Sequence, residues 1–218
     1  MLGVTTPLLW YTTRASGIVA LVLLSGSVVL GLITSARAGT HRWPRFAVSD
    51  LHRKVSLLAV VFVCIHVLTA VVDTFVPIGL LAALVPLTSH YKTLWVALGT
   101  VAFDLLLAVA ITSMLRTRIR AGTWRAVHWA SYLSWPIAVA HGVEMGTDMR
   151  FVWVDGLVAV CCIAVMMTFG WRVVARPLRV GAGVAASSEH AVRMAREGRV
   201  TAAIVPIDRR PPTSAEVR

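Results

Sequence analysis

Residues 52–66 read HRKVSLLAVVFVCIH, a largely apolar stretch that begins and ends with a histidine. Residues 128–141 read HWASYLSWPIAVAH and repeat this arrangement further along the chain. Both stretches belong to apolar segments of about the 20 residues that a helix needs to cross a bilayer. Ionisable side chains inside such segments are expensive and are by default candidates for a functional site. Two segments that each carry two histidines therefore predict a membrane protein with a site between its helices.

The composition agrees with a membrane protein over the whole chain. Hydrophobic residues make up 57% of 218 positions and charged residues 14%, whereas a soluble domain is about half apolar and a quarter charged. Five stretches are long enough to span a bilayer. They are residues 10–34, 55–76, 93–115, 127–143 and 151–174. We therefore predict an all-α fold, a polytopic membrane helix bundle with five transmembrane helices.

Three further segments, at residues 77–87, 188–197 and 208–218, are not expected to span the membrane. The apolar run at residues 77–87 is too short and is predicted to be an interfacial or re-entrant piece. The membrane domain is expected at residues 8–175, followed by a short, partly disordered cytoplasmic tail at 176–218. Within the tail, residues 188–197 are predicted to form a short helix that ends at Gly198, and residues 208–218 are predicted to be disordered.

The basic residues predict how the chain lies in the membrane. The formal net charge is +11, and all of the 21 Lys and Arg residues except Arg14, Lys92 and Arg150 fall in the first and third connections or at and beyond the end of the fifth span. The positive-inside rule then puts the N-terminus outside and the C-terminus in the cytoplasm of a multi-pass cell-membrane protein. This placement accounts for the charge without a nucleic-acid partner.

The spacing of the four histidines places them at two depths. His66 is the fourteenth residue after His52, a spacing that returns to within about 40° of one helix face and separates the rings by about 20 Å. His141 is the thirteenth residue after His128, and Pro136 between them can change the phase of that helix. Because both spans run from the cytoplasm outward, His52 is expected to face His128 at the inner level, and His66 to face His141 at the outer level.

Facing imidazoles from two helices are the two axial ligands that a six-coordinate haem iron needs, since its macrocycle fills the other four positions. Two such sites at two depths predict two haems and an electron path across the membrane. A protein-only zinc site would instead gather three or four ligands. The alternative that stays open is a non-redox scaffold or transporter, in which the histidines make only structural hydrogen bonds between helices.

Over about residues 8–175 the chain resembles the ferric reductase-like transmembrane domain family. Besides the histidine pairs, the resemblance rests on TRASG at 13–17, ITSMLR at 111–116 and WRAVH at 124–128. The family includes the haem cores of NADPH oxidases and metalloreductases and the membrane subunit of methionine sulfoxide reductase. The resemblance implies b-type haems held by paired histidines of two helices. Many members have six spans, where five are predicted here.

The resemblance also implies partners. Full reductases carry a flavin and nicotinamide-binding domain, and nothing after Pro177 resembles the glycine-rich loop of such a domain. We therefore expect a separate flavoprotein or a membrane quinone as donor, and an outer-face flavin protein, metal centre or small oxidant as acceptor. Whether the chain is an enzyme stays open, and the resemblance favours the haem-carrying membrane subunit of an oxidoreductase. Direct action on ferric chelates is a further alternative.

Several other residues are candidates beside the histidines. Arg14 could pair with a propionate of the outer haem, and Arg53 and Arg125 with those of the inner haem, because a buried carboxylate needs a partner. The alternatives are snorkelling and contact with lipid headgroups. Asp104, in the middle of the third span, is expected to be protonated and hydrogen bonded to a neighbouring hydroxyl such as that of Ser131 or Tyr132, with proton handling as the alternative. Trp135 is expected to pack rather than to bridge the two haems.

Overall fold

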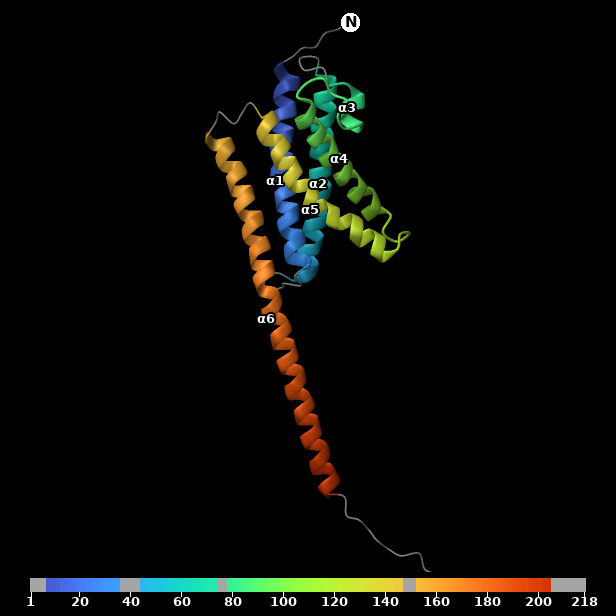
Figure 1. The fold of residues 1–218 in the computed structure, drawn as a ribbon, viewed down its shortest axis with the longest axis vertical. Coiled ribbons are helices and arrows are strands. Elements are labelled where there is room, and N and C mark those ends of the chain that lie inside the picture. The colour runs from blue at the N-terminus through green and yellow to red at the C-terminus, as the bar shows by residue number, and fades with distance from the viewer. Residues whose placement is uncertain (1–6, 36–43, 74–77, 147–151, 205–218) are drawn as a thin grey trace, which may run out of the picture. The chain divides into compact units, whose positions relative to one another are not determined.

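The computed structural model describes residues 7–35, 44–73, 78–146 and 152–204, and most of these residues form helices (Figure 1). No strand occurs in this part of the chain, so the predicted all-α class is confirmed. The helices are α1 (Pro7–Ser35), α2 (Arg45–Val72), α3 (Leu80–Leu84), α4 (Thr93–Met114), α5 (Ala121–Met145) and α6 (Val152–Ile204).

Four helices in the described ranges are long and apolar enough to cross a membrane. They are Leu8–Ser35, Arg45–Val72, Thr93–Met114 and Val152–Val174. The 25-residue α5 is not among them, because its histidines, serines and arginine lower its hydropathy. A membrane protein with several apolar helices is thus confirmed, while the fifth crossing, by α5, stays a prediction.

The short helix α3 lies in the segment predicted not to cross. Its five residues extend about 8 Å along the helix axis, far less than the roughly 30 Å of a hydrocarbon core. Among the described residues, α4 is the one helix between α2 and α5 that is long and apolar enough to cross a membrane. This connectivity lets α2 and α5 run in the same direction.

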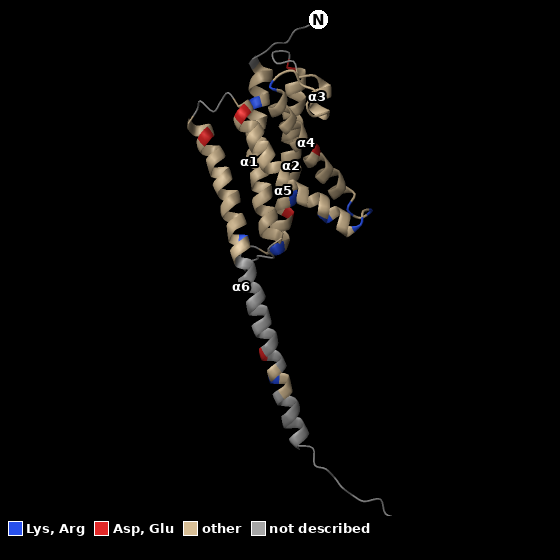
Figure 2. Cartoon of the chain, in the orientation of Figure 1, with Lys and Arg blue, Asp and Glu red and all other residues tan. Residues whose placement is uncertain are grey.

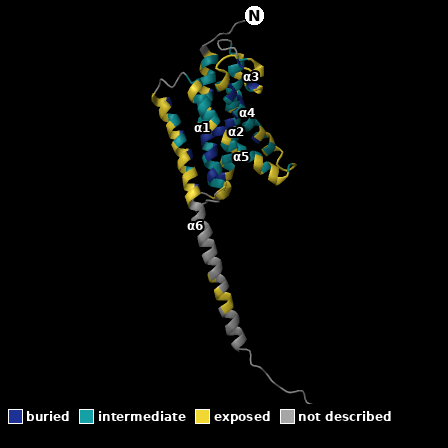
Figure 3. Cartoon of the chain, viewed as in Figure 1, coloured by how far each residue is buried: buried dark blue, intermediate teal, exposed yellow. Residues whose placement is uncertain are grey.

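The bundle is built around α1. It packs mainly against α2, and α4 packs mainly against α5. The buried core joins Leu24, Val28 and Leu32 of α1 to Trp135 of α5 and Val165 of α6. Figure 3 shows many of the buried positions along α1, whereas α6 is largely exposed on the side away from it.

Hydrogen bonds between side chains also join the helices. The hydroxyls of Ser27 on α1 and Ser56 on α2 lie 2.6 Å apart. The indole Nε1 of Trp135 donates to Ser25 Oγ at 2.9 Å. In a bilayer these polar groups have no water to bond, so partners on neighbouring helices stabilise the packing. Trp135 is therefore a packed core residue, as its position in the sequence predicts.

Basic residues are more numerous toward one end of the bundle than toward the other. Figure 2 shows basic residues on α2 and on the α4–α5 connection, away from the end that carries the N-terminus. This agrees with the asymmetry on which the topology rests. The orientation itself, with the N-terminus outside, remains a prediction.

The chain divides into two compact units, residues 1–172 and 173–218, and α6 contributes to both. Because α6 continues without a break to Ile204, the prediction of a separate short helix at 188–197 is wrong. Gly198 does not end the helix, since one glycine costs a helix only about 1 kcal/mol and alanine and arginine around it favour helix. Residues 208–218 lie outside the described part.

Arg172 of α6 is a buried charge held by the end of α1. It is 9% exposed, and its Nη1 donates to the carbonyl oxygen of Leu32 at 3.2 Å and to Ser35 Oγ. The last four carbonyls of a helix have no partner within it, and the helix dipole favours a cation there. Arg172 thus caps α1 and fastens α6 to it.

Replacing Arg172 should loosen this contact. Arg172→Met keeps much of the side chain's length but leaves the carbonyl of Leu32 without its charged donor, so we expect a loss of about 2 kcal/mol. Thermal unfolding in detergent measures the change. Arg118→Met, at an exposed arginine, is the control and should unfold at the wild-type temperature; equal effects of the two would contradict the capping role.

Candidate functional site

The four span histidines meet as two pairs between α2 and α5. The ring centroids of His52 and His128 lie 6.3 Å apart with an interplanar angle of 84°. Those of His66 and His141 also lie 6.3 Å apart, at 80°. We call His52 and His128 the inner pair, and His66 and His141 the outer pair, after the predicted topology. The structure therefore brings together the residues that the sequence spacing pairs.

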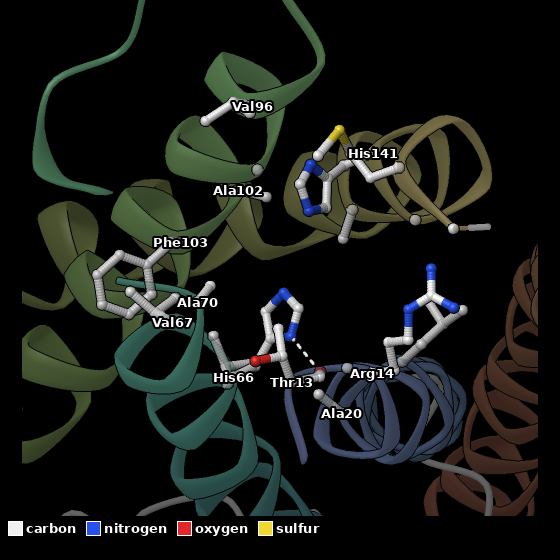
Figure 4. Close-up of a pocket in the computed structure, with 18 of the residues that line it drawn as sticks. Thr13, Arg14, Ala20, His66, Val67, Ala70, Val96, Ala102, Phe103 and His141 are labelled. Carbon is white, nitrogen blue, oxygen red and sulfur yellow. Dashed lines mark hydrogen bonds between the residues drawn. The ribbon is translucent and has the colours of Figure 1, made fainter. Parts of the chain in front are cut away.

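The separation within each pair fits a metal ion bound by both rings. A metal–imidazole bond is about 2 Å long, and an atom of a five-membered ring lies about 1.2 Å from the ring centre. Two imidazoles on opposite sides of one ion would have centroids about 6.4 Å apart. The observed 6.3 Å agrees with this value at both levels. Figure 4 shows the outer imidazoles directed toward each other from α2 and α5.

Backbone carbonyls of the neighbouring helices orient three of the four imidazoles. The hydrogen bonds join His66 Nδ1 to Thr13 O at 2.8 Å, His141 Nδ1 to Trp95 O at 2.7 Å and His52 Nδ1 to Ser27 O at 3.0 Å. A carbonyl only accepts, so Nδ1 carries the proton and Nε2 keeps its lone pair. Histidines that bind metals almost always donate their second nitrogen in this way.

Three glycines leave room for the imidazoles to approach these carbonyls. A Cβ would lie within 3.3 Å of the imidazole at each of three glycines: 2.9 Å from His66 Nδ1 at Gly17, 3.3 Å from His52 Cε1 at Gly31, and 2.5 Å from His141 Cε1 at Gly99. Each glycine stands four residues after the bonded carbonyl. Because a helical carbonyl points toward residue i+4, a side chain there would cover it. Glycine leaves the oxygen open for a second hydrogen bond.

These glycines were missed in the sequence, although a signal for two of them is present. Gly31 is the fourteenth residue after Gly17, the same spacing as that of His52 and His66. Two antiparallel helices in contact have the same rise per residue, so equal spacings meet at two levels. Gly99 has no such partner on α4.

His128 is held differently. Its ring stacks on Trp124, one turn earlier on α5, with centroids 4.8 Å apart and an angle of 19°. Its Nδ1 and the Nε1 of Trp124 are buried, and neither has a hydrogen-bond partner among the described residues. The two pairs therefore share one geometry but differ in how their rings are fixed.

A cavity of about 460 Å³ surrounds the outer pair, a size typical of small-ligand and cofactor sites. Its lining is mostly apolar and includes Phe103 and Val67 beside His66 and His141 (Figure 4). Such a lining suits a large apolar ring that is bound on both faces. Among the described residues no three His, Cys, Asp or Glu side chains gather as metal ligands.

The three candidate arginines lie in different surroundings. Arg14 lines the outer cavity, and its guanidinium lies 3.8 Å from the centre of the Trp10 ring. Arg53 is 83% exposed, with Nη2 3.6 Å from Asp50. Arg125 is exposed, and its Nε donates to the carbonyl of Ala121 on its own helix at 3.2 Å. The structure brings Arg14 to a histidine pair, whereas Arg53 and Arg125 have contacts on their own helices.

Asp104 lies half-buried on α4. The hydroxyl of Ser131, one of the partners expected for it, instead donates to the carbonyl of His128 at 2.7 Å. No hydrogen bond between Asp104 and Ser131 is present among the described residues.

The comparisons with known proteins identify the family. A family model described as the ferric reductase-like transmembrane component matches residues 16–139. The chain belongs to this family. The match includes three of the four histidines and ends two residues before His141. Searches of curated proteins and of solved structures found no match. The resemblance seen in the sequence is thus confirmed, and a ferric reductase-like domain indicates transmembrane electron transfer.

The packing of glycine against histidine can be tested directly. Gly99→Ala would force His141 away from Trp95, so we expect a loss of about 2 kcal/mol of stability, measured by thermal unfolding in detergent. Gly142 is the matched control, because a Cβ there meets nothing within 4 Å. Gly142→Ala should be neutral or slightly stabilising, since alanine favours helix. A neutral Gly99→Ala would contradict the close contact.

Proposed function

We propose that this ferric reductase-like protein carries electrons across a membrane through two b-type haems. His52 and His128 would hold the inner haem, and His66 and His141 the outer haem. The observation that supports this most strongly is the 6.3 Å separation of two facing imidazoles, repeated at two levels. Haem is also the group that domains of this family generally bind.

The residues around each pair would prepare it for iron. A bound haem supplies an iron that takes up and gives away one electron. Carbonyls of α1 and α4 keep the proton on Nδ1 of His52, His66 and His141 and would leave the Nε2 lone pair free for the iron. The apolar lining of the outer cavity keeps water away, and Arg14 at its edge would pair with a propionate.

The two sites would form a path along the bundle. The helical rise from His52 to His66 corresponds to about 20 Å between the irons, and the macrocycles would extend into part of that gap. Trp135 packs at an intermediate level of α5. With α5 as the fifth span, the inner pair would face the cytoplasm and the outer pair the outside.

The chain would act as the membrane subunit of an oxidoreductase system. A separate flavoprotein or a membrane quinone would donate electrons at the inner face, and an outer flavin protein, metal centre or small oxidant would accept them. The competing hypothesis, a non-redox scaffold with structural histidines, predicts a purified protein whose spectrum does not depend on these residues.

Haem stoichiometry separates these hypotheses. Wild type purified from haem-replete cells should contain about two haems per chain, and His52→Ala or His66→Ala about one, because each haem needs both axial ligands. The measurement is the amplitude of the b-type α-band in reduced-minus-oxidised spectra, normalised to protein.

His90→Ala is the matched control. His90 is exposed in the connection between α3 and α4, so its replacement should leave both haems in place. A colourless wild-type protein, or a loss of haem that does not depend on which histidine is changed, would refute the two-haem assignment.

Transfer across the bilayer is a second test. Vesicles that contain the protein and enclose a membrane-impermeant reductant should reduce ferricyanide added outside. His66→Ala should lose most of this transfer while its remaining haem is still reduced, because an electron would have to cross the rest of the membrane without a carrier. Equal rates for His66→Ala and wild type would show that the outer pair is not on the path.

A further inference from the structure

The two histidine pairs differ in one hydrogen bond. In the outer pair both imidazoles have Nδ1 against a backbone carbonyl oxygen, at 2.8 and 2.7 Å. In the inner pair only His52 has such a bond, at 3.0 Å. The Nδ1 of His128 is buried without a hydrogen-bond partner in the part of the chain that the structure describes.

The sequence of α4 explains why a carbonyl is not offered to His128. The thirteen-residue step between the two histidines of α5, taken along antiparallel α4 from Trp95, leads to Ala108. The carbonyl of Ala108 already accepts from Thr112 Oγ1 at 2.7 Å. Thr112 is the fourth residue after Ala108. At the other three imidazoles the fourth residue after the bonded carbonyl is a glycine. If equal steps along antiparallel helices meet at one level, His128 faces Ala108, which offers neither the open space nor the open acceptor that the other three imidazoles have.

This difference should act on the iron. A carbonyl that accepts from Nδ1–H makes the imidazole a stronger electron donor to the metal, and such outer hydrogen bonds tune haem potentials. A stronger donor stabilises ferric over ferrous iron and so lowers the potential. Resting on the function proposed above, we propose that the inner pair holds its iron at a higher reduction potential than the outer pair.

Charges near the two pairs act in the same direction. The guanidinium of Arg116 lies 4.5 Å from the centre of the Trp124 ring, which in turn stacks on His128. A nearby cation favours the less positive, reduced iron and raises its potential. The outer cavity is lined by one residue of each sign, Arg14 and Asp73, whose effects oppose each other.

The order of potentials determines where an electron resides. One electron at a time would pass from the flavin or quinol donor to an iron held by His52 and His128, and from there to an iron held by His66 and His141, each iron changing between Fe³⁺ and Fe²⁺. The inner iron would then be reduced first, and the outward step would be uphill. A membrane potential that is negative inside drives an electron outward and offsets this difference. Outward transfer should therefore be faster across a membrane with such a potential than across one without it.

Potentiometric titration of single-haem variants tests the order. His66→Ala retains only the inner haem and His52→Ala only the outer haem. We expect the haem of His66→Ala to titrate at the higher potential. Equal potentials, or the reverse order, would overturn the inference while leaving the two-haem path intact. Wild type without haem would instead refute the proposed function itself.

Two matched glycine substitutions on α1 test the physical cause in the intact protein. Gly17→Ala pushes His66 back and weakens its bond to Thr13, so the outer potential should rise and the gap between the two potentials should narrow. Gly31→Ala does the same to His52, so the inner potential should rise and the gap should widen. Gly26→Ala is the control, because a Cβ there meets only Val55 at 3.9 Å.

The direction of these shifts is decisive. The role of the carbonyl bonds would be contradicted if the difference between the two potentials changed in the same direction in Gly17→Ala and Gly31→Ala. It would also be contradicted if this difference changed in neither variant. If Gly17→Ala loses the outer haem, the titrations of His66→Ala and His52→Ala still decide the order.

Discussion

The hydrogen bond from an imidazole Nδ1 to a backbone carbonyl of a neighbouring helix is the constraint on which the rest of the bundle depends. A histidine in a membrane has two ring nitrogens to satisfy and no water to satisfy them. If one nitrogen is to stay available for a ligand, the other must find an acceptor, and a helical carbonyl is within reach only where the adjoining residue has no side chain. Gly17, Gly31 and Gly99 meet this requirement. They bring α1 close to α2 and α4 close to α5, which are the main contacts of the fold.

The same constraint explains why α1 is central. It supplies the carbonyls of Thr13 and Ser27 to the two histidines of α2, and between these levels Ser25 accepts from Trp135 of α5. Below them Arg172 of α6 caps its last turn. Because α1 bonds to α2, α5 and α6, a displacement of α1 would disturb both histidine pairs. The structural core and the site are therefore one set of contacts rather than a scaffold with a site added to it.

The helices and the pairing of the histidines could be predicted because both follow from helical geometry along a single chain. Apolar length predicts a span, and the spacing of His52 and His66 predicts two levels on one face. The predicted separate helix at 188–197 was wrong because a cap and a glycine are weak signals beside a long run of helix-forming residues. The role of the glycines was missed because a glycine in a membrane helix is common, and its meaning depends on which side chain lies opposite.

The sequence by itself determined that this is an all-helical membrane protein of the ferric reductase-like family with histidines at two depths, since hydropathy and spacing are local properties that each segment carries alone. Only the tertiary structure decided that three imidazoles bond carbonyls over glycines, that His128 stacks on Trp124 instead, and that Arg14 lines the outer cavity while Arg53 pairs with Asp50. These facts depend on how one helix is rotated about its axis relative to the next. That rotation results from the packing of the whole bundle, and no single stretch of sequence specifies it.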